Sequence, residues 1–360
     1  MSSSSKQISR RHFGTLAAAA LALPGAASAA SHPLPHRPGH PMKRHLIKPP
    51  RLVEGDLVGL IAPSGHTSDA SIEKSVRNIE ALGFRCKQGE NLRAVHGNYA
   101  GSVQQRLLDL HAMFADPQVK AIWCIRGGSG CISLLSQLDY ALIRANPKVL
   151  LGYSDITALH LAIGRHAGLV TFHGPVASST PSDYSTAHML AVLMDPQPTY
   201  TIPMAMENDL RSRVEPHYAI RTVHGGQATG TLTGGNLSMV SALVGTAYAA
   251  DFRDSILFIE EINEAPYRID RWLTQLDLSL GLNKAAAVMI GICEHCGGAD
   301  EDLTLTLDET LDIHLRPLTV PAVTGYSFGH IRNQFTIPMG VRARLDTERQ
   351  TVTLLEPAVV

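Results

Sequence analysis

The chain has 360 residues, which is more than one hydrophobic core usually holds, so two domains are expected. Hydrophobic residues make up 44% and charged residues 18% of the sequence, a balance that excludes intrinsic disorder and is typical of a globular enzyme or binding protein. The 31 basic and 32 acidic side chains give a net charge of -1, which provides no electrostatic basis for binding nucleic acid. Because the sequence has no long, strongly apolar run, we expect no stable membrane insertion.

Residues 1–29 are predicted to form a signal peptide of the twin-arginine type. Arg10 and Arg11 precede a mildly apolar run at 16–23, and the small residues 27–29 offer a cleavage site. We therefore expect the protein to be periplasmic or otherwise exported. The alternatives are a Sec signal and a disordered tail.

Residues 30–50 are rich in proline and histidine and are expected to form an extended tether. Such a tract can bind metal, but this one lacks cysteine or acidic partners at fixed spacing, which favours a spacer. The chain has an odd number of cysteines, so at least one thiol stays unpaired or pairs with another chain. The five are Cys86, Cys124, Cys131, Cys293 and Cys296.

Residues 51–177 are expected to form a first domain in which apolar strands alternate with amphipathic helices. The periodicity predicts strands at 57–62, 84–87, 121–125 and 148–152 and helices at 71–82, 103–114 and 155–165. This alternation predicts a parallel sheet with helices on both faces. Sheets of this kind carry their sites at the carboxyl ends of the strands.

The periodic pattern loosens after residue 177, and the segment 178–224, rich in Ser, Thr and Pro, is interpreted as a linker. A second domain is expected over 225–360. Its predicted helices are 237–244, 265–280 and 305–315, and its predicted strands are 255–262, 286–293 and 320–324. Two more strands, 341–345 and 351–355, are predicted to form a closing antiparallel hairpin.

Ser154 lies at a sharp turn between a buried strand and a helix, which would lift its hydroxyl above the sheet. The turn resembles a nucleophile elbow, although Ile156 replaces the second glycine of that motif, and an ordinary helix cap is the alternative. A glycine-rich turn at 126–130 lacks both common phosphate-binding patterns. Its bare backbone N–H groups could instead face the serine and hold an oxyanion.

The second domain offers a candidate base and acid. Glu260 and Glu261 end one predicted strand, and His330 follows another. A serine hydroxyl needs a base to take its proton, and an imidazole oriented by a carboxylate is the usual solution. A strand-end histidine satisfied by backbone groups is the alternative. Because side chains alternate along a strand, only one of the two acids can point into the site.

Five short motifs occur in a fixed order along the chain. They are residues 126–128, 152–157, 234–237, 258–261 with 266–271, and 329–330 with 336–340. Together they resemble the LD-carboxypeptidase family of serine peptidases, which includes the microcin C immunity peptidases. The resemblance extends from about residue 56 to residue 338.

The resemblance implies that Ser154 is the nucleophile, that His330 is the general base and acid, and that Glu260 orients the imidazole. The backbone N–H groups of Gly128 and Asp155 match the family's oxyanion hole. The implied fold is a Rossmann-like amino-terminal domain followed by a smaller β/α domain, with the active site between them. The implied reaction is hydrolysis of the amide bond to the terminal D-alanine of muropeptide tetrapeptides. A homodimer is usual in the family, and no metal or cofactor is implied.

Two other functions remain open at this point, namely a microcin C-type amidase and a non-catalytic muropeptide-binding protein. The family often has Tyr and Arg where this chain has Ser129 and Ser133, so substrate range is less defined than reaction type. Arg126, Arg268 and Arg332 lie near the motifs and are candidates for binding the terminal carboxylate.

The spacing of Cys293 and Cys296 is that of a redox pair or of half a zinc site. No second pair of closely spaced cysteines is present in the sequence to complete a tetrahedral set. A loop at a strand end with two thiols is therefore favoured.

Overall fold

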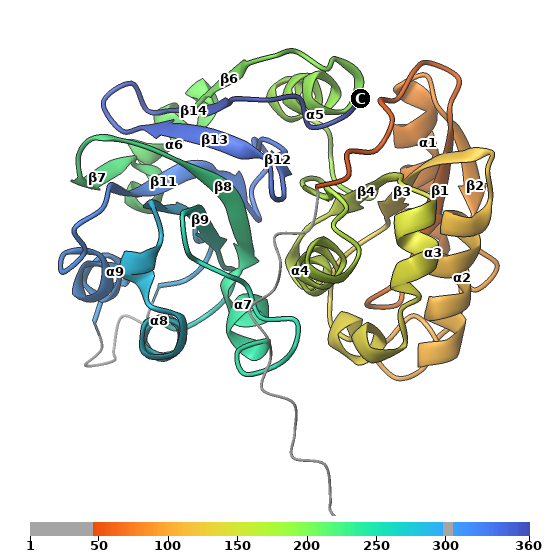
Figure 1. Cartoon of the computed structure of the whole chain (residues 1–360), viewed down its shortest axis with the longest axis horizontal. Coiled ribbons are helices and arrows are strands. Elements are labelled where there is room, and N and C mark those ends of the chain that lie inside the picture. The colour runs from red at the N-terminus through yellow and green to blue at the C-terminus, as the bar shows by residue number, and fades with distance from the viewer. Residues whose placement is uncertain (1–45, 298–304) are drawn as a thin grey trace, which may run out of the picture. The chain divides into compact units, whose positions relative to one another are not determined.

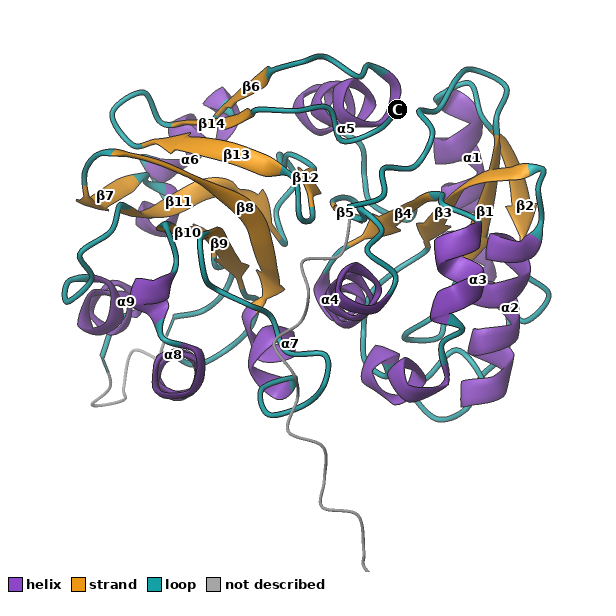
Figure 2. Cartoon of the chain, in the orientation of Figure 1, coloured by secondary structure: helices purple, strands orange, loops and turns teal. Residues whose placement is uncertain are grey.

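The computed structural model describes residues 46–297 and 305–360, which belong to one compact unit. These residues form two β-sheets with helices packed against them (Figure 1 and Figure 2). The expected signal peptide and most of the expected tether lie outside the described residues. Among the helices of the described part, none has the length and apolar character needed to cross a bilayer.

The first sheet has the strand order β12-β5-β4-β3-β1-β2, and its five amino-terminal strands run parallel. The parallel arrangement and four of these strands were predicted, whereas β5 was not. The carboxyl ends of β3, β4 and β5 therefore meet at one edge, where the glycine-rich turn and Ser154 follow. The strands are β1 (Leu57–Ile61), β2 (Arg85–Gln88), β3 (Val119–Cys124), β4 (Val149–Gly152) and β5 (Phe172–His173). The helices of this half are α1 (Asp69–Ala81), α2 (Val103–Ala115), α3 (Tyr140–Ala145), α4 (Thr157–His166) and α5 (Asp183–Met194).

The second sheet is mixed, with the order β6-β14-β13-β8-β9-β10-β11-β7. Its centre, β8 to β11, is parallel, and antiparallel strands flank it. The strands are β6 (Tyr200–Pro203), β7 (Arg221–His224), β8 (Gln227–Asn236), β9 (Ser255–Glu260), β10 (Ala287–Ile292), β11 (Ala322–Gly329), β13 (Arg342–Asp346) and β14 (Thr351–Leu354). The helices are α6 (Met206–Ser212), α7 (Leu237–Ala242), α8 (Pro266–Leu280) and α9 (Leu307–Leu315).

The two halves are interlocked. Strand β12 (Ile337–Pro338) comes from the carboxy-terminal half but pairs antiparallel with β5 of the first sheet. Helix α4 packs against both β8 and α7, and one continuous hydrophobic core includes residues of both sheets, such as Leu151 and Phe258. The predicted α/β class, with a parallel amino-terminal sheet followed by a second β/α unit, is confirmed.

The segment 178–224 differs from the linker expected there, because it contains α5, β6, α6 and β7. Helix α5 buries Met189, Val192 and Leu193, but other apolar residues, such as Leu190 and Met194, lie on its remaining faces, so no amphipathic pattern marks the helix in the sequence. Strands β6 and β7 lie at opposite edges of the second sheet, where one neighbour is missing and polar residues are tolerated.

Strand β8 was not predicted, although it is ten residues long and central. Its sequence contains three glycines, and its β-branched residues are threonines without Val or Ile, which weakens the strand signal. Burial of alternate residues from Gly230 onwards shows that packing against β9 and β13 stabilises it instead.

The glycine at position 234 is expected to be essential for this packing. Its φ is 136°, a conformation that side chains avoid, and an added Cβ would collide with the carbonyl oxygen of Phe258 in β9. Gly234→Ala should therefore lower the free energy of unfolding by about 3 kcal/mol or more. Gly164→Ala is the control, because nothing lies within 4 Å of the added methyl group in α4, and it should stabilise by about 0.5–1 kcal/mol. Urea unfolding of both variants checks the ranking, and equal stabilities would contradict it.

Candidate active site

The turn that carries Ser154 is strained. Strand β4 ends at Gly152, a short 3-10 turn (Ser154–Ile156) follows, and α4 continues from it. Ser154 has a φ of 65°, in the left-handed region that residues other than glycine rarely adopt. Gly127 makes room for it, since a Cβ there would lie 2.9 Å from the Ser154 hydroxyl oxygen. The sequence thus places a serine where strain and a glycine-lined approach expose its hydroxyl.

The carboxylate of Asp155 ties this turn to the glycine-rich turn. Its Oδ2 accepts hydrogen bonds from the Ser64 hydroxyl at 2.6 Å and from the Cys131 backbone N–H at 2.9 Å. The side chain of Asp155 is buried. The two turns are therefore held in fixed relation by one buried acid.

Gly128 and Asp155 were predicted to supply the oxyanion N–H groups. Gly128 has a φ of 131°, and within the described residues its N–H donates to no protein acceptor. The N–H of Asp155 lies in the first turn of a helical segment, where such groups lack intrahelical acceptors. Both donors can therefore bind a developing negative charge, and this role stays a prediction.

Glu260 and His330 form a buried pair. Nδ1 of His330 donates a hydrogen bond to Oε2 of Glu260 at 2.7 Å, as expected from the motifs, and this leaves Nε2 free to act as a base. The exposed fraction of the side chain is 0% for Glu260 and 13% for His330. Gly329 permits the approach, because a Cβ there would lie 3.2 Å from Cβ of Glu260. The imidazole thus reaches the surface while its partner acid does not.

The pair is electrostatically coupled. Burial acts to lower the pKa of His330, but the charge and hydrogen bond of Glu260, with the charge of Glu261, outweigh it and raise that pKa. Burial acts to raise the pKa of Glu260, but His330 and His173 outweigh it and lower the pKa. Each partner therefore stabilises the charged form of the other.

Glu261 directly follows the last residue of β9, and its carboxylate bonds to the start of α7 rather than to His330. Its carboxylate accepts from Nδ2 of Asn236 at 2.8 Å and from the backbone N–H groups of Ser238 and Ile262. Burial and the charge of Glu260 raise the pKa of Glu261. Its position at the start of α7 indicates a structural role.

The serine turn and the Glu260–His330 pair lie close together. Tyr153 precedes the serine, and the centroid of its ring is 4.6 Å from that of the His330 ring. The start of α4 also contacts the second sheet, since the backbone N–H of Asn236 donates to the Thr157 hydroxyl at 3.0 Å. Asn236 pairs with Glu260 in the β8–β9 ladder. The structure therefore places the turn that carries Ser154 next to the Glu260–His330 pair. That Nε2 of His330 faces the Ser154 hydroxyl stays a prediction.

His173 is a site residue that the sequence did not single out. It ends β5, next to Gly152, and its ring centroid lies 6.0 Å from that of Tyr153. Burial lowers its pKa to about 4, so the ring is neutral at neutral pH, and neither ring nitrogen has a hydrogen-bond partner among the described residues. Because no strand was predicted at 172–173, the sequence did not place this histidine beside Gly152.

The loop after His330 is held by the segment expected to be a linker. The hydroxyls of Ser182 and Ser185 donate to the Arg332 carbonyl, and the Ser185 oxygen accepts from the Gln334 backbone N–H. Nδ2 of Asn208 donates to the Asn333 carbonyl at 2.9 Å. These contacts hold the loop that directly follows His330. The interpretation of 178–224 as a linker did not predict them.

The three candidate arginines lie in different surroundings. Arg126 bonds to the carbonyls of Gly127 and His66 beside the glycine-rich turn, and Arg268 pairs with Glu264. Arg332 makes no ion pair within residues 46–297 and 305–360, and it lines a cavity together with His330. The structure therefore favours Arg332 as a cation available to a ligand.

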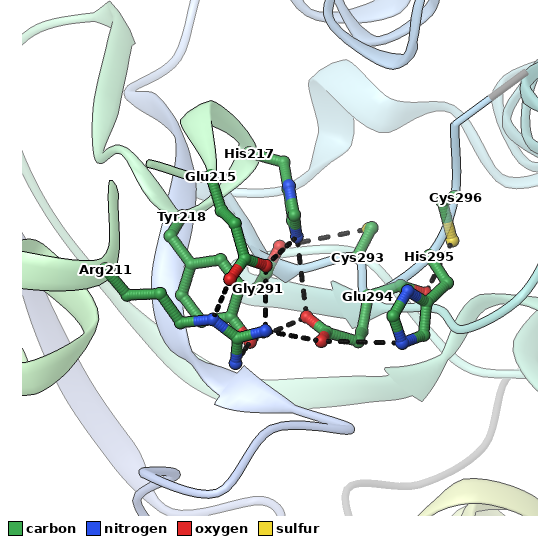
Figure 3. A network of polar contacts seen from close by, with 9 residues as sticks. All are labelled: Arg211, Glu215, His217, Tyr218, Gly291, Cys293, Glu294, His295 and Cys296. Carbon is green, nitrogen blue, oxygen red and sulfur yellow. Dashed lines mark hydrogen bonds and ion pairs between the residues drawn. The ribbon is translucent and has the colours of Figure 1, made fainter. Parts of the chain in front are cut away.

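A separate polar network includes a group of metal-ligating side chains: Glu215, His217 and Glu294 (Figure 3). Arg211 already binds Glu215 at 2.6 Å and Glu294 at 3.2 Å, and the Tyr218 hydroxyl donates to Glu294 at 2.6 Å. These carboxylates have their charge balanced by a side chain of the protein, so the arrangement is that of an ion-pair network.

Cys293 and Cys296 adjoin this network and are buried free thiols, as are Cys124 and Cys131. The hydrogen bond with Cys296 and burial raise the pKa of the Cys293 thiol well above its usual value. Thiols kept protonated are poor metal ligands and poor nucleophiles. These properties are consistent with the predicted loop.

Comparisons with known proteins identify the family. Residues 58–174 match the family model of the LD-carboxypeptidase N-terminal domain, and residues 229–345 match that of the LD-carboxypeptidase C-terminal domain. The chain is 36% identical over 313 residues to a probable murein peptide carboxypeptidase of Bacillus subtilis, covering 85% of this chain and 94% of that protein.

Two solved structures share the fold. An MccF-like protein from Bacillus anthracis superimposes with a TM-score of 0.76 at 30% identity, covering 86% of this chain and 99% of that one. A muramoyltetrapeptide carboxypeptidase from Oxalobacter formigenes superimposes with a TM-score of 0.71 at 28% identity, covering 83% of this chain and 97% of that one. The chain therefore belongs to the LD-carboxypeptidase family, and it is a hydrolase of the carboxypeptidase type.

Proposed function

We propose that this protein is a serine LD-carboxypeptidase that hydrolyses the amide bond to the terminal D-alanine of muropeptide tetrapeptides. The observation that carries the proposal is the buried Glu260–His330 pair beside the strained Ser154 turn. The names of the Bacillus subtilis and Oxalobacter formigenes relatives, which refer to murein peptides and muramoyltetrapeptides, support the substrate class.

In the first half of the proposed reaction, Nε2 of His330 takes the proton of the Ser154 hydroxyl as the oxygen attacks the scissile carbonyl. The carboxylate of Glu260 holds the Nδ1–H and stabilises the imidazolium that forms. The N–H groups of Gly128 and Asp155 bind the negative oxygen of the tetrahedral intermediate. His330 then gives its proton to the leaving amine, and the peptide remains as an ester on Ser154.

In the second half, a water molecule replaces the amine. His330 takes a proton from the water, whose oxygen attacks the ester carbonyl, and then returns a proton to the Ser154 oxygen as it leaves. The products are a tripeptide and a free amino acid. No step requires a group beyond the chain's own residues and water.

A microcin C-type amidase is the second candidate, because the structural likeness to an MccF-like protein is as strong as that to a muramoyltetrapeptide carboxypeptidase. The same residues would cleave an acyl-nucleotide conjugate. Assaying a tetrapeptide and such a conjugate side by side separates the two functions.

A non-catalytic binding protein would not need the Glu260–His330 hydrogen bond. The homodimer that the family resemblance implies stays a prediction.

We also propose that the protein is exported by the twin-arginine route, on the basis of the paired arginines and small-residue site in the sequence. Replacing both Arg10 and Arg11 with Lys should leave the precursor in the cytoplasm, because the route recognises the arginine pair. Immunoblotting of cell fractions measures this. A mature protein of unchanged size in the periplasm would contradict the assignment.

Ser154→Ala should lower the rate of tetrapeptide hydrolysis by about a millionfold without unfolding the protein, because it removes the nucleophile of a cooperating set. Ser154→Gly should be equally inactive but more stable than the wild type, since glycine relieves the strain at φ 65°. Rate measurement and thermal unfolding give the two readouts. Residual activity above a few per cent would exclude the serine mechanism.

Glu260→Gln should lower kcat by several orders of magnitude, because an amide cannot stabilise the imidazolium and can hold the wrong ring tautomer. Glu261→Gln is the matched control at the next residue. It should lower stability by loosening the start of α7 and change kcat far less. The opposite ranking of kcat would contradict the assignment of the two acids.

The dependence of kcat/KM on pH should report the same pair. His330 must be neutral to act as a base, and its pKa is raised above the usual 6.5, so activity should rise with pH through a midpoint above 6.5. In Glu260→Gln that midpoint should fall, because the charge that holds the proton on the ring is gone. An unchanged midpoint in this variant would show that another group titrates.

A further inference from the structure

A cavity of about 580 Å³ lies against the side of the site that carries His330. Tyr153 and His330 line it, together with residues of α1, α5 and the loop that follows His330, whereas Ser154 does not. Much of its lining is apolar: Leu82, Trp123, Pro175, Val176, Met189 and Ile331. The cavity is therefore next to the general acid but not to the nucleophile.

We propose that this cavity binds the leaving amino acid of the substrate, which under the proposed function is a D-amino acid, and that it accepts apolar side chains bulkier than that of D-alanine together with a free carboxylate. This inference rests on the proposed function. His330 delivers its proton to the leaving amine, so the leaving residue must lie on the His330 side of the scissile bond, while the rest of the peptide stays with Ser154.

Arg332 supplies the charge that a terminal carboxylate needs. It follows His330 by two residues and lines the cavity, and no acidic side chain in the described ranges pairs with it. The hydroxyls of Ser182 and Ser185 bond its backbone carbonyl, which fixes where the side chain begins. A guanidinium in this position can bind a carboxylate through two parallel hydrogen bonds.

Gln334 supplies an acceptor for the amine. This residue is 3% exposed and lines the cavity. Its Nε2 donates a hydrogen bond to the Ile331 carbonyl at 3.2 Å. The amide oxygen, Oε1, has no hydrogen-bond partner in the described part of the chain. A buried acceptor without a donor is costly, and an N–H of the bound amino acid would satisfy it.

The apolar walls set the side-chain preference. The indole N–H of Trp123 donates to the Pro175 carbonyl at 2.7 Å, so its polar atom is satisfied and its ring contributes apolar surface. A volume of about 580 Å³ is within the range of sites for whole small molecules, and a single methyl group would leave most of it unfilled. Burial of each further CH₂ group contributes about 0.8 kcal/mol, so larger apolar side chains gain affinity.

The test uses tetrapeptides that differ only in the last residue, ending in D-alanine or D-leucine. The wild type should cleave the D-leucine peptide with a kcat/KM at least about tenfold higher, in line with the discrimination that apolar pockets achieve. Thr186→Trp, which fills the cavity from α5, should remove this preference. Ala187→Trp, at the exposed neighbouring position outside the cavity, should retain it.

Arg332→Gln should raise KM for the D-leucine peptide about tenfold or more with little change in kcat. A peptide whose terminal carboxylate is replaced by a carboxamide should be cleaved equally by the wild type and this variant. A merely structural role for Arg332 would affect both peptides alike, and that result would overturn its assignment.

Binding to Ser154→Ala separates the failure of this inference from the failure of the proposed function. Calorimetry should show that free D-leucine binds more tightly than free D-alanine, and that Thr186→Trp abolishes the difference. If the wild type cleaves tetrapeptides but D-alanine and D-leucine perform equally in both assays, the inference is wrong and the proposed function stands. If no peptide is cleaved and D-leucine still binds preferentially, the proposed reaction is wrong, and the cavity is a site for an apolar D-amino acid but not for a leaving group.

Discussion

The hydrogen bond from the Asn236 backbone N–H to the Thr157 hydroxyl joins the two halves of the protein at the site. Thr157 begins α4 immediately after the serine turn, and Asn236 ends β8 opposite Glu260. Gly235 has no side chain, which allows Thr157 to lie against its backbone. The position of Ser154 relative to Glu260, and through Glu260 to His330, depends on this contact between a helix start and a strand end.

Two adjacent carboxylates, Glu260 at the end of β9 and Glu261 directly after it, have different hydrogen-bond partners. Glu260 shares its buried charge with an imidazole, and the interaction keeps both groups charged more readily than either would be alone. Glu261 is surrounded by amide N–H donors and caps the start of α7. One buried pair therefore prepares the base, while the neighbouring acid keeps β8, β9 and α7 together.

Much of the parallel sheet and the site could be predicted from the sequence, because both depend on local signals. The apolar runs at β1, β3 and β4 and the serine turn after β4 have the periodicity and composition that their conformations require. The pairing of Glu260 with His330 came from the family motifs, since 70 residues separate the two and no local pattern joins them.

The remaining features depend on tertiary contacts that leave little trace in composition. Strand β8 is rich in glycine because neighbouring backbones and Thr157 approach it closely, and those glycines hide its strand character. The segment 178–224 reads as a polar connection, yet Ser182, Ser185 and Asn208 hold the loop that carries His330. His173 has its place only through the pairing of β5 with β4.

The central claim is that Ser154, activated by the Glu260–His330 pair, becomes covalently attached to the substrate. Reaction with a fluorophosphonate ester, followed by mass spectrometry of peptides, tests it directly because the reagent labels activated serines. We expect stoichiometric label on the peptide that contains Ser154 and its loss in His330→Ala, whose fold should be unchanged. Label on another residue, or on Ser154 at the same rate in His330→Ala, would contradict the claim.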